Sequence, residues 1–282
     1  MIFDKLQANK LSFYGVCSYG RSGSSYLMRF LALAGLTVIG ELPFEDRTTQ
    51  AALIAALKLR LKVPLRPDGH SDDRHQFYGD DFYRSSIITN VTNLGELNSH
   101  YDSFLKANKT DNGLGIAEKF VGFDILQVMK SYDPSNLVRP IFLMRDPRDI
   151  FISAKEFNKR RGKPGFGDSG NDQALFSAIC NFLLWQKRHA SRFRALICYY
   201  EDLMVKRSQT ILDLLRHIGL SGTSKEFVDG MLIRLADIKG AQSHMTSETA
   251  EKSIARWQQP EYAALLPVFG KYDMQLNELG YL

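Results

Sequence analysis

The loop at residues 18–27 (SYGRSGSSYL) carries residue types that suit the binding of a phosphate-like anion. Gly20 and Gly23 permit tight turns and a close approach of the backbone to a ligand. The apolar run before the loop predicts a strand, and the apolar residues after it recur at helical spacing. A loop that opens a helix directs several unpaired backbone N–H groups at one point, with the helix dipole behind them, which predicts an anion site.

The side chains of this loop add further donors. Ser22, Ser24 and Ser25 supply hydroxyl groups, and Arg21 supplies a permanent positive charge. Each charge-assisted hydrogen bond contributes about 1.5–3 kcal/mol, so a few of them hold a phosphate group. The alternative interpretation is a glycine- and serine-rich turn that merely precedes a helix. The GxxxxGK[ST] pattern is missing, since no lysine follows Gly23, and no convincing Mg²⁺ arrangement accompanies the loop.

A second segment, RDPRDIFIS at residues 145–153, has the spacing of another anion site. Arg145 follows an apolar run predicted as a strand, so its side chain should emerge at the carboxyl end of that strand. Asp146 and Pro147 predict an N-cap and a first helical position. Ser153 then lies about two turns into the helix. Arg145 and Ser153 can face one phosphate if this helix packs beside the loop.

Two charged residues of this second segment, Arg148 and Asp149, leave two interpretations open. They form a solvated or inter-helix pair, which contributes little to stability, or they contact the ligand directly. Asp146 is interpreted as a structural cap.

The two segments together resemble the signature of the superfamily of sulfotransferases that use 3′-phosphoadenosine-5′-phosphosulfate (PAPS). Its members place an Arg-Ser-Gly-Ser/Thr-Thr-like loop after the first strand, which RSGSSYL at 21–27 matches. They also place an Arg-Asp/Asn-Pro-Arg-Asp segment later, with a serine eight residues beyond its first arginine, as at 145–153. The order, the strand–helix context and the spacing all match.

The resemblance implies a reaction and a role for each residue. The chain is expected to move a sulfuryl group from PAPS to an acceptor hydroxyl by metal-free in-line transfer, with adenosine 3′,5′-bisphosphate as product. Arg145 and Ser153 bind the 3′-phosphate, and Arg21 stabilises the leaving group. The residues that cradle the 5′-phosphosulfate are Ser22, Gly23, Ser24, Ser25 and Tyr26.

Two later segments extend the resemblance. In YYEDL at 199–203, Tyr200 is placed near the adenine, although a core tyrosine at a strand end would look the same. The segment KSIARW is similar to the basic and aromatic loop that closes over the nucleotide in many members. Its Lys252, Ser253 and Arg256 could reach the phosphates, or they could form a solvated helix face.

The acceptor must lose a proton, so a base is expected. Small-molecule members use a histidine before the 3′-phosphate strand, but residues 118–139 contain none, and the nearest, His100, lies in a polar stretch. GELPFEDR resembles the Gly-Glu-Pro-x-Glu pattern of bacterial trehalose-type members, with one residue extra, which implies Glu45 as base and Glu41 as second choice. A glutamate near arginines has a lowered pKa and can accept a proton. Both glutamates could instead be surface residues of a loop.

The elements expected to position these residues alternate along the chain. Strands are predicted at 13–19, 121–129, 138–144 and 195–200, and helices after residue 24 and at 48–62, 147–160 and 173–193. This alternation predicts an α/β fold, a P-loop-like sandwich with a short central parallel sheet flanked by helices. One domain over 1–282 is expected, with acceptor-side loops at about 41–112 and a flexible loop at about 159–172.

The overall composition excludes several classes of protein. The chain has 282 residues, 44% of them hydrophobic, and a formal net charge of +5 from scattered basic residues, so nucleic acid is not the expected partner. No stretch approaches the roughly 20 apolar residues that cross a bilayer. Three dispersed cysteines and the lack of a signal peptide predict a cytoplasmic protein. No metal site is expected, because HSDDRHQ at 70–76 has no standard ligand spacing.

Three hypotheses about function follow from these observations. The first is a sulfotransferase, for which a carbohydrate or glycolipid acceptor is favoured and a small phenol or a peptide tyrosine is left open. The rival enzyme is a P-loop kinase or other phosphoryl transferase. The third is a catalytically inactive nucleotide-binding module, which would bind the same ligand without turnover.

Overall fold

Strands alternate with helices along the chain, and every strand pair described in this computed structural model is parallel. The structure describes the following residues: 2–8, 11–39, 49, 52, 55–56, 92–107, 115–119, 123–131, 133, 136–205, 208–236 and 251–282. The predicted helix at 48–62 and most of the predicted acceptor-side loops therefore lie outside the described residues. The predicted α/β class, with a parallel sheet flanked by helices, is confirmed.

The chain divides into two compact units that interleave in sequence. One unit combines residues 1–17 with 28–140, and the other combines 18–27 with 141–282. The single domain expected from the sequence stays a prediction. Both predicted anion-binding segments, 18–27 and 145–153, belong to the second unit.

The first unit contains three parallel strands, β1 (Ser12–Ser18), β2 (Thr37–Ile39) and β3 (Gly115–Lys119), in the order β2-β3-β1. In the register, Phe13 of β1 pairs with Ile116 of β3. All five residues of β3 are buried. Strands covered on both faces in this way are typical of parallel sheets in α/β proteins.

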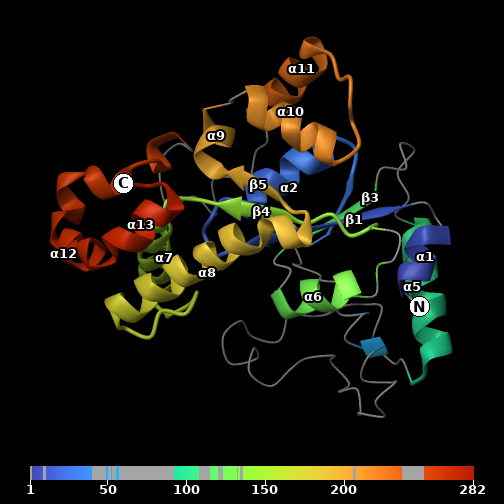
Figure 1. The fold of residues 1–282 in the computed structure, drawn as a ribbon, viewed down its shortest axis with the longest axis horizontal. Helices are drawn as coiled ribbons and strands as arrows, with labels where there is room; N and C mark the ends of the chain where they lie inside the picture. The colour runs from blue at the N-terminus through green and yellow to red at the C-terminus, as the bar shows by residue number, and fades with distance from the viewer. Residues whose placement is uncertain are drawn as a thin grey trace. The chain divides into compact units, whose positions relative to one another are not determined.

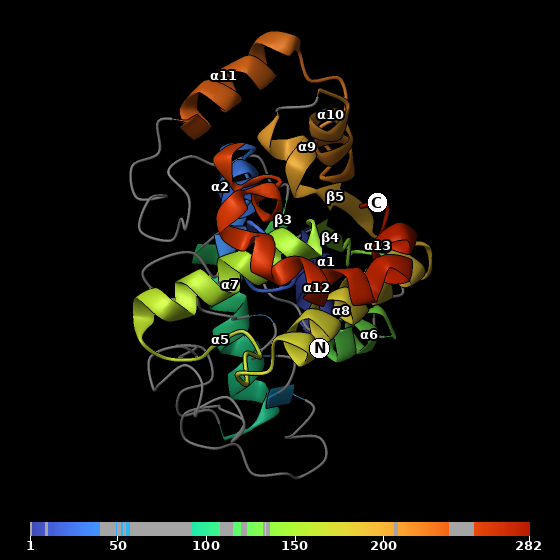
Figure 2. The same ribbon diagram turned by 90° about the vertical axis from the view of Figure 1, so that its left-hand side faces the viewer.

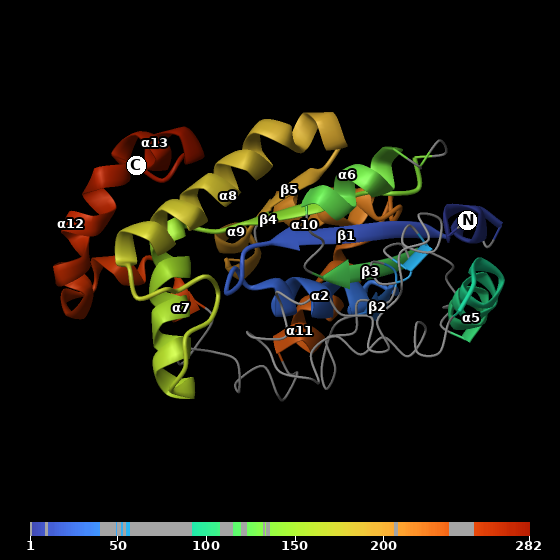
Figure 3. The ribbon, with the colours of Figure 1, turned by 90° about the horizontal axis from the view of Figure 1, so that it is seen from below.

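The helices described beside these strands are α1 (Ile2–Ala8), α2 (Ser24–Leu33), α5 (Leu94–Ala107) and α6 (Phe123–Ser131). Helices α1 and α5 lie side by side (Figure 3). The predicted strand at 121–129 is wrong, because α6 occupies most of it and the strand lies earlier, at β3. Leu126 and Met129 of α6 are both buried at a helical spacing of three residues.

The second unit is built on two parallel strands, β4 (Ile141–Met144) and β5 (Leu196–Tyr199). Helix α7 (Pro147–Arg161) follows β4, and helix α8 (Asp172–Phe193) precedes β5 and packs against both strands (Figure 1). These strands and helices confirm the predictions at 138–144, 147–160, 173–193 and 195–200. The predicted N-cap is also present, since Asp146 accepts a hydrogen bond from the Arg148 N–H at 2.9 Å.

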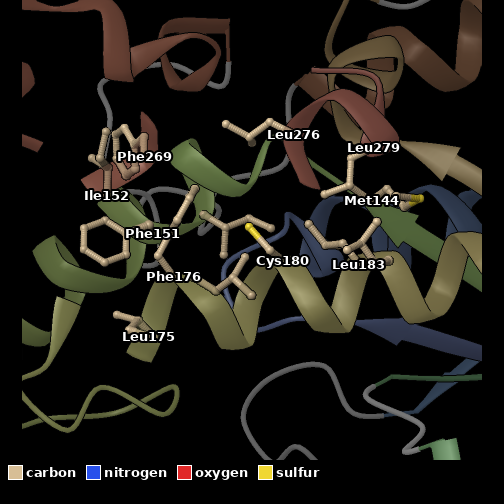
Figure 4. Packing of buried hydrophobic residues seen from close by; sticks show 13 residues of the cluster. Met144, Phe151, Ile152, Leu175, Phe176, Cys180, Leu183, Phe269, Leu276 and Leu279 are labelled. Carbon is tan, nitrogen blue, oxygen red and sulfur yellow. The ribbon is translucent and has the colours of Figure 1, made fainter. Parts of the chain in front are cut away.

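The apolar core of the second unit lies between α7, α8 and the two C-terminal helices α12 (Leu266–Phe269) and α13 (Asp273–Leu279). Figure 4 shows Phe151, Phe176 and Phe269 meeting there. The Phe176 and Phe269 ring centroids are 4.8 Å apart. Each such side chain contributes about 1.5–3 kcal/mol on burial, so this cluster fixes α7, which carries the second predicted anion segment.

The other elements described in the second unit are helices α9 (Tyr200–Met204), α10 (Ser208–His217) and α11 (Lys225–Ala236), followed by short 3₁₀ turns. Helices α9 and α10 pack against β5 (Figure 2). The 3₁₀ turns are η2 (Glu251–Ser253), η3 (Arg256–Gln258), η4 (Pro260–Leu265) and η5 (Gly270–Tyr272). Within the described residues, no helix is both long and apolar enough to span a membrane.

Candidate anion-binding site

The loop after β1 forms a tight turn that leads into α2. Arg21 and Gly23 both have left-handed backbone conformations, with φ of 74° and 88°. The carbonyl oxygen of Gly23 accepts hydrogen bonds from the N–H groups of Tyr26 at 3.0 Å and Leu27 at 3.3 Å. The turn thus leaves the earliest N–H groups of α2 without a partner inside the helix, which is the geometry expected of an anion site.

Two glycines of this loop are required by close packing. A Cβ atom added to Gly23 would lie 2.2 Å from Cδ2 of Tyr200, and one added to Gly20 would lie 2.2 Å from Cδ1 of Phe166. Gly23 also needs its positive φ, which other residues adopt only with strain. The loop is therefore in contact with two aromatic rings that come from distant parts of the chain.

Two buried hydroxyl groups of the loop have no hydrogen-bond partner in the part of the chain that the structure describes. Ser22 is 0% exposed, and its Oγ is unpartnered among the described residues, as is the Oγ of Ser18. A buried polar group without a partner costs about 1–3 kcal/mol. A ligand that accepts hydrogen bonds from these hydroxyl groups would offset that cost, so the orphaned hydroxyls fit a phosphate or sulfate group.

Arg145 joins the loop to the C-terminal segment. It directly follows β4 and is buried, and its Nη1 donates to the carbonyl oxygen of Arg21 at 2.9 Å. Its Nη2 donates to the carbonyl oxygen of Ser253 at 2.6 Å, and its guanidinium lies 4.5 Å from the centroid of the Tyr200 ring. Its Nε finds no partner among the described residues. Arg145 therefore retains one buried donor for a ligand.

Ser153 and Arg21 are in direct contact. The Nε of Arg21 donates to the Oγ of Ser153 at 3.3 Å, and its guanidinium lies 4.3 Å from the centroid of the Phe157 ring. Ser153 and Phe157 are one turn apart on α7. The structure thus brings the loop residue and the helix residue predicted for the two ends of one ligand within hydrogen-bond distance of each other.

The local charge around Arg21 is positive. Burial, together with the charges of three neighbouring arginines, lowers the pKa of the Arg21 guanidinium to about 10. These neighbours are Arg145, Arg160 and Arg256. A guanidinium whose charged form is disfavoured by like charges is stabilised by a nearby anion. The electrostatics of this part of the second unit therefore favour a polyanionic ligand.

The C-terminal segment contributes buried residues rather than a solvated face. Ser253 is buried, and its hydroxyl shares a 2.9 Å hydrogen bond with the hydroxyl of Tyr200. Arg256 is buried as well and pairs through Nη2 with Glu156 at 2.7 Å and with the hydroxyl of Tyr262 at 2.6 Å. Lys252 is exposed. Of the three residues predicted here, Ser253 lies beside Arg145.

Tyr200 is buried between the loop and the arginine. Its ring lies against Gly23 on one side and under the guanidinium of Arg145, and its hydroxyl contacts Ser253. Most of this side chain is buried, as expected of a core tyrosine at the end of a strand. Its position at the junction of the loop, β4 and the C-terminal segment still makes it a border of the same site.

The predicted pair of Arg148 and Asp149 is wrong. Arg148 instead forms a buried ion pair with Asp146 at 2.7 Å and lies 3.7 Å from the centroid of the Trp257 ring. Asp149 accepts hydrogen bonds from two backbone N–H groups, those of Ala255 and Arg256. The adjacent opposite charges in RDPRD do not reveal that Arg148 pairs with Asp146, or that Asp149 binds the backbone of residues 255 and 256.

The aromatic residues beside the loop at 18–27 are not predicted from the sequence. The hydroxyl of Tyr19 donates to the carbonyl oxygen of Phe166 at 2.7 Å, and the rings of Phe157 and Phe166 meet edge to face at 5.5 Å. Phe166 belongs to the connection between α7 and α8, where the sequence predicts a flexible loop. Residues 159–161 are still helical, and Asn158 donates to Gly165. The flexibility of this connection stays a prediction.

The candidate bases are not placed. Glu41 and Glu45 lie outside the described residues, and His100 lies on the exposed surface of α5 in the first unit. Among the residues that the structure describes, no group of three or more His, Cys, Asp or Glu side chains is arranged to hold a metal ion.

The sequence matches no family model and no curated protein. Similar solved structures include a mouse sulfotransferase, SULT7A1, in complex with PAP, at 11% identity and a TM-score of 0.48, which covers 100% of this chain and 93% of the mouse chain. Another is a sulfotransferase from Alicyclobacillus acidocaldarius, at 15% identity and a TM-score of 0.44, covering 80% of this chain and 91% of that one.

A third similar structure is the sulfotransferase domain from the curacin biosynthetic pathway, at 14% identity and a TM-score of 0.44, covering 93% of this chain and 97% of that one. The function proposed for the chain is based on the contacts around Arg145 and the loop.

Proposed function

We propose that this chain is a sulfotransferase that moves a sulfuryl group from PAPS to an acceptor hydroxyl. The observation that carries the proposal is the position of Arg145, which contacts both the Arg21 carbonyl of the loop and the Ser253 carbonyl of the C-terminal segment. Two buried donors here, the Oγ of Ser22 and the Nε of Arg145 itself, have no hydrogen-bond partner among the described residues.

The donor chemistry fits this arrangement because PAPS carries both of its phosphate groups on one ribose. Two adjacent groups of donors are therefore needed, one for each phosphate. Ser22, Gly23, Ser24, Ser25 and Tyr26 would hold the 5′-phosphosulfate at the start of α2, while Arg145 and Ser153 would hold the 3′-phosphate. Lys252, Ser253 and Arg256 would close the site from the C-terminal segment, and Tyr200 would border the adenine.

The reaction itself requires charge stabilisation on the leaving phosphate and a base for the acceptor. PAPS supplies the activated sulfuryl group. Arg21 is the cationic residue of the loop and would stabilise the charge that develops on the departing bisphosphate. We assign the base to Glu45, with Glu41 as second choice. A metal ion is not required by these roles.

The acceptor is proposed to be a hydroxyl compound, with a carbohydrate or glycolipid favoured because GELPFEDR resembles the base segment of sugar-modifying members. The proposal is tested by offering PAPS labelled in the sulfuryl group to a panel of sugars, glycolipids and phenols. Transfer to at least one of them is expected. Arg21→Ala and Glu45→Gln should abolish most of it.

The rival function is phosphoryl transfer from a nucleoside triphosphate. The panel therefore includes γ-labelled ATP with Mg²⁺, for which no transfer is expected because no lysine follows Gly23. Label transfer from ATP would replace the sulfotransferase proposal. Binding of the bisphosphate without any turnover, unaffected by Glu45→Gln, would instead identify an inactive binding module.

A further inference from the structure

Asp149 is a fully buried carboxylate whose bonding partners lie far away in the sequence. It is 0% exposed and belongs to the first turn of α7, four residues after Arg145. Its Oδ2 accepts from the N–H of Ala255 and its Oδ1 from the N–H of Arg256, each at 2.8 Å. Both carboxylate oxygens are thus directed at the backbone of one short segment.

The backbone at this point has a conformation that needs support. Ala255 has φ of 55°, a left-handed conformation that alanine seldom adopts, and it immediately precedes the 3₁₀ turn η3. The N–H groups at the start of a helical turn have no partner within the turn, so an aspartate that accepts from two of them at once is a strong cap.

The segment held in this way is the one that reaches Arg145. Ser253 lies two residues before Ala255, and its carbonyl oxygen accepts from Arg145 at 2.6 Å. On the other side, the Arg256 side chain pairs with Glu156, which is two turns further along α7 than Asp149. Residues 253–256 are therefore held at three points: by Arg145, which precedes α7, by Asp149 at the start of α7, and by Glu156 in the middle of α7.

We propose that Asp149 is a positioning residue that fixes residues 252–256 beside Arg145, so that this segment completes the site for the 3′-phosphate of the donor. The proposal rests on the sulfotransferase function proposed above. Asp149 does not touch the nucleotide, because both of its oxygens are engaged by backbone N–H groups. It acts through the backbone of Ala255 and Arg256, and thereby through the position of Ser253 and Lys252.

The experiment compares two nucleotides in Asp149→Asn and in the unmodified protein. Adenosine 3′,5′-bisphosphate has the 3′-phosphate, and adenosine 5′-phosphate lacks it. The asparagine has the same shape but only one oxygen, and its NH₂ group faces a backbone N–H that it cannot accept from. We expect Asp149→Asn to lower the ratio of the two affinities roughly tenfold, the effect of about one charge-assisted hydrogen bond.

A second measurement follows the two hydrogen bonds that Asp149 accepts. Hydrogen exchange of the Ala255 and Arg256 amides should become faster in Asp149→Asn. The matched control is Asp229→Asn on the exposed surface of α11, which should change neither the affinity ratio nor the exchange at 255 and 256. An unchanged ratio, an equal loss of affinity for both nucleotides, or unchanged exchange in Asp149→Asn overturns the positioning role.

Two further outcomes are separable. If the unmodified protein does not prefer the bisphosphate over adenosine 5′-phosphate, the proposed function is wrong. The positioning role of Asp149, which rests on that function, is then wrong as well. If Asp149→Asn does not fold, Asp149→Glu carries the test, since it keeps the charge but adds a methylene group that displaces the segment. Its affinity ratio should also fall, and an unchanged ratio would overturn the proposal.

Discussion

Arg21 combines three properties that a leaving-group cation needs. Its backbone is fixed in a left-handed turn, its guanidinium rests on the Phe157 ring, and its Nε contacts Ser153. Neighbouring arginines also disfavour its charge, so an arriving anion gains more from it than from a solvated arginine. At this scale the sequence singles out Arg21 and Ser153, and the structure brings their side chains within hydrogen-bond distance, while their roles toward a ligand stay predictions.

Removing the Arg21 side chain should affect turnover more than binding. We expect Arg21→Ala to lower kcat about 10²–10³-fold, the usual effect of losing one donor that stabilises developing charge. The dissociation constant of adenosine 3′,5′-bisphosphate should change much less. Rates with labelled PAPS and calorimetric titrations provide the two numbers. Arg234→Ala, on the exposed surface of α11, is the control. A loss confined to nucleotide affinity would contradict the role.

Gly23 should not tolerate a side chain. In Gly23→Ala the new Cβ would meet the Tyr200 ring and the backbone would be strained at φ 88°, so we expect a loss of about 2 kcal/mol or more in the free energy of unfolding. Gly230→Ala is the matched control, because its Cβ meets nothing within 4 Å in α11, and it should stabilise by about 0.5–1 kcal/mol. Urea denaturation of both variants measures the difference, and equal stabilities would contradict the packing described here.

At the scale of elements, sequence patterns identify the second unit better than the first. The strands and helices around Arg145 are predicted correctly because Asp146-Pro147 marks a helix start and the flanking strands are short, uninterrupted apolar runs. The misassigned segment VGFDILQVM shows the limit, since its apolar residues fit both a strand and an amphipathic helix. The true strand, GIAEK, is buried although it contains Glu118 and Lys119, which no hydropathy pattern reveals.

The connection between α7 and α8 also escapes sequence analysis. A glycine-rich basic stretch predicts a flexible loop, which stays a prediction, but it gives no sign that Tyr19 and Gly20 both contact Phe166 within it. These contacts link residues about 147 positions apart, and composition carries no information about them. They place an aromatic ring against the loop that is proposed to hold the phosphosulfate.

Phe166 should help to exclude water from that loop. In Phe166→Ala we expect PAPS to lose sulfate to water faster when no acceptor is present, because the ring no longer covers Gly20. Sulfate release from labelled PAPS measures this directly. The control, Phe227→Ala, removes a phenylalanine ring from the exposed face of α11 and should leave the rate of sulfate release unchanged. A rate in Phe166→Ala equal to that of the control would contradict a shielding role.

At the scale of the whole molecule, the buried carboxyl groups make stability depend on pH. Burial raises the pKa of Glu201 to about 7, and its neighbours include Arg145, the charge of Asp146 and the hydroxyl of Tyr281. The folded state then holds this proton more tightly than the unfolded chain does. Its contribution to stability is present below the ordinary glutamate pKa and is lost as the pH rises through about 7.

Glu201→Gln should remove part of this dependence. The glutamine keeps an oxygen that can accept from the Asp146 N–H, which the glutamate does at 2.8 Å, but it carries no charge. We expect the variant to be more stable than the unmodified protein at pH 8 and to lose less stability between pH 5 and pH 8. Denaturant titrations at several pH values measure both. A variant with the same slope as the unmodified protein would show that Glu201 does not titrate in this range.

The central claim is that Arg145 and the loop at 18–27 together bind one nucleotide with two phosphate groups. Calorimetric titration with adenosine 3′,5′-bisphosphate in the absence of Mg²⁺ tests it most directly. The account predicts saturable one-to-one binding that Arg145→Ala and Ser153→Ala each weaken at least tenfold, with little binding of ATP and Mg²⁺. Binding that is indifferent to both substitutions, or tight binding of ATP and Mg²⁺ alone, would contradict it.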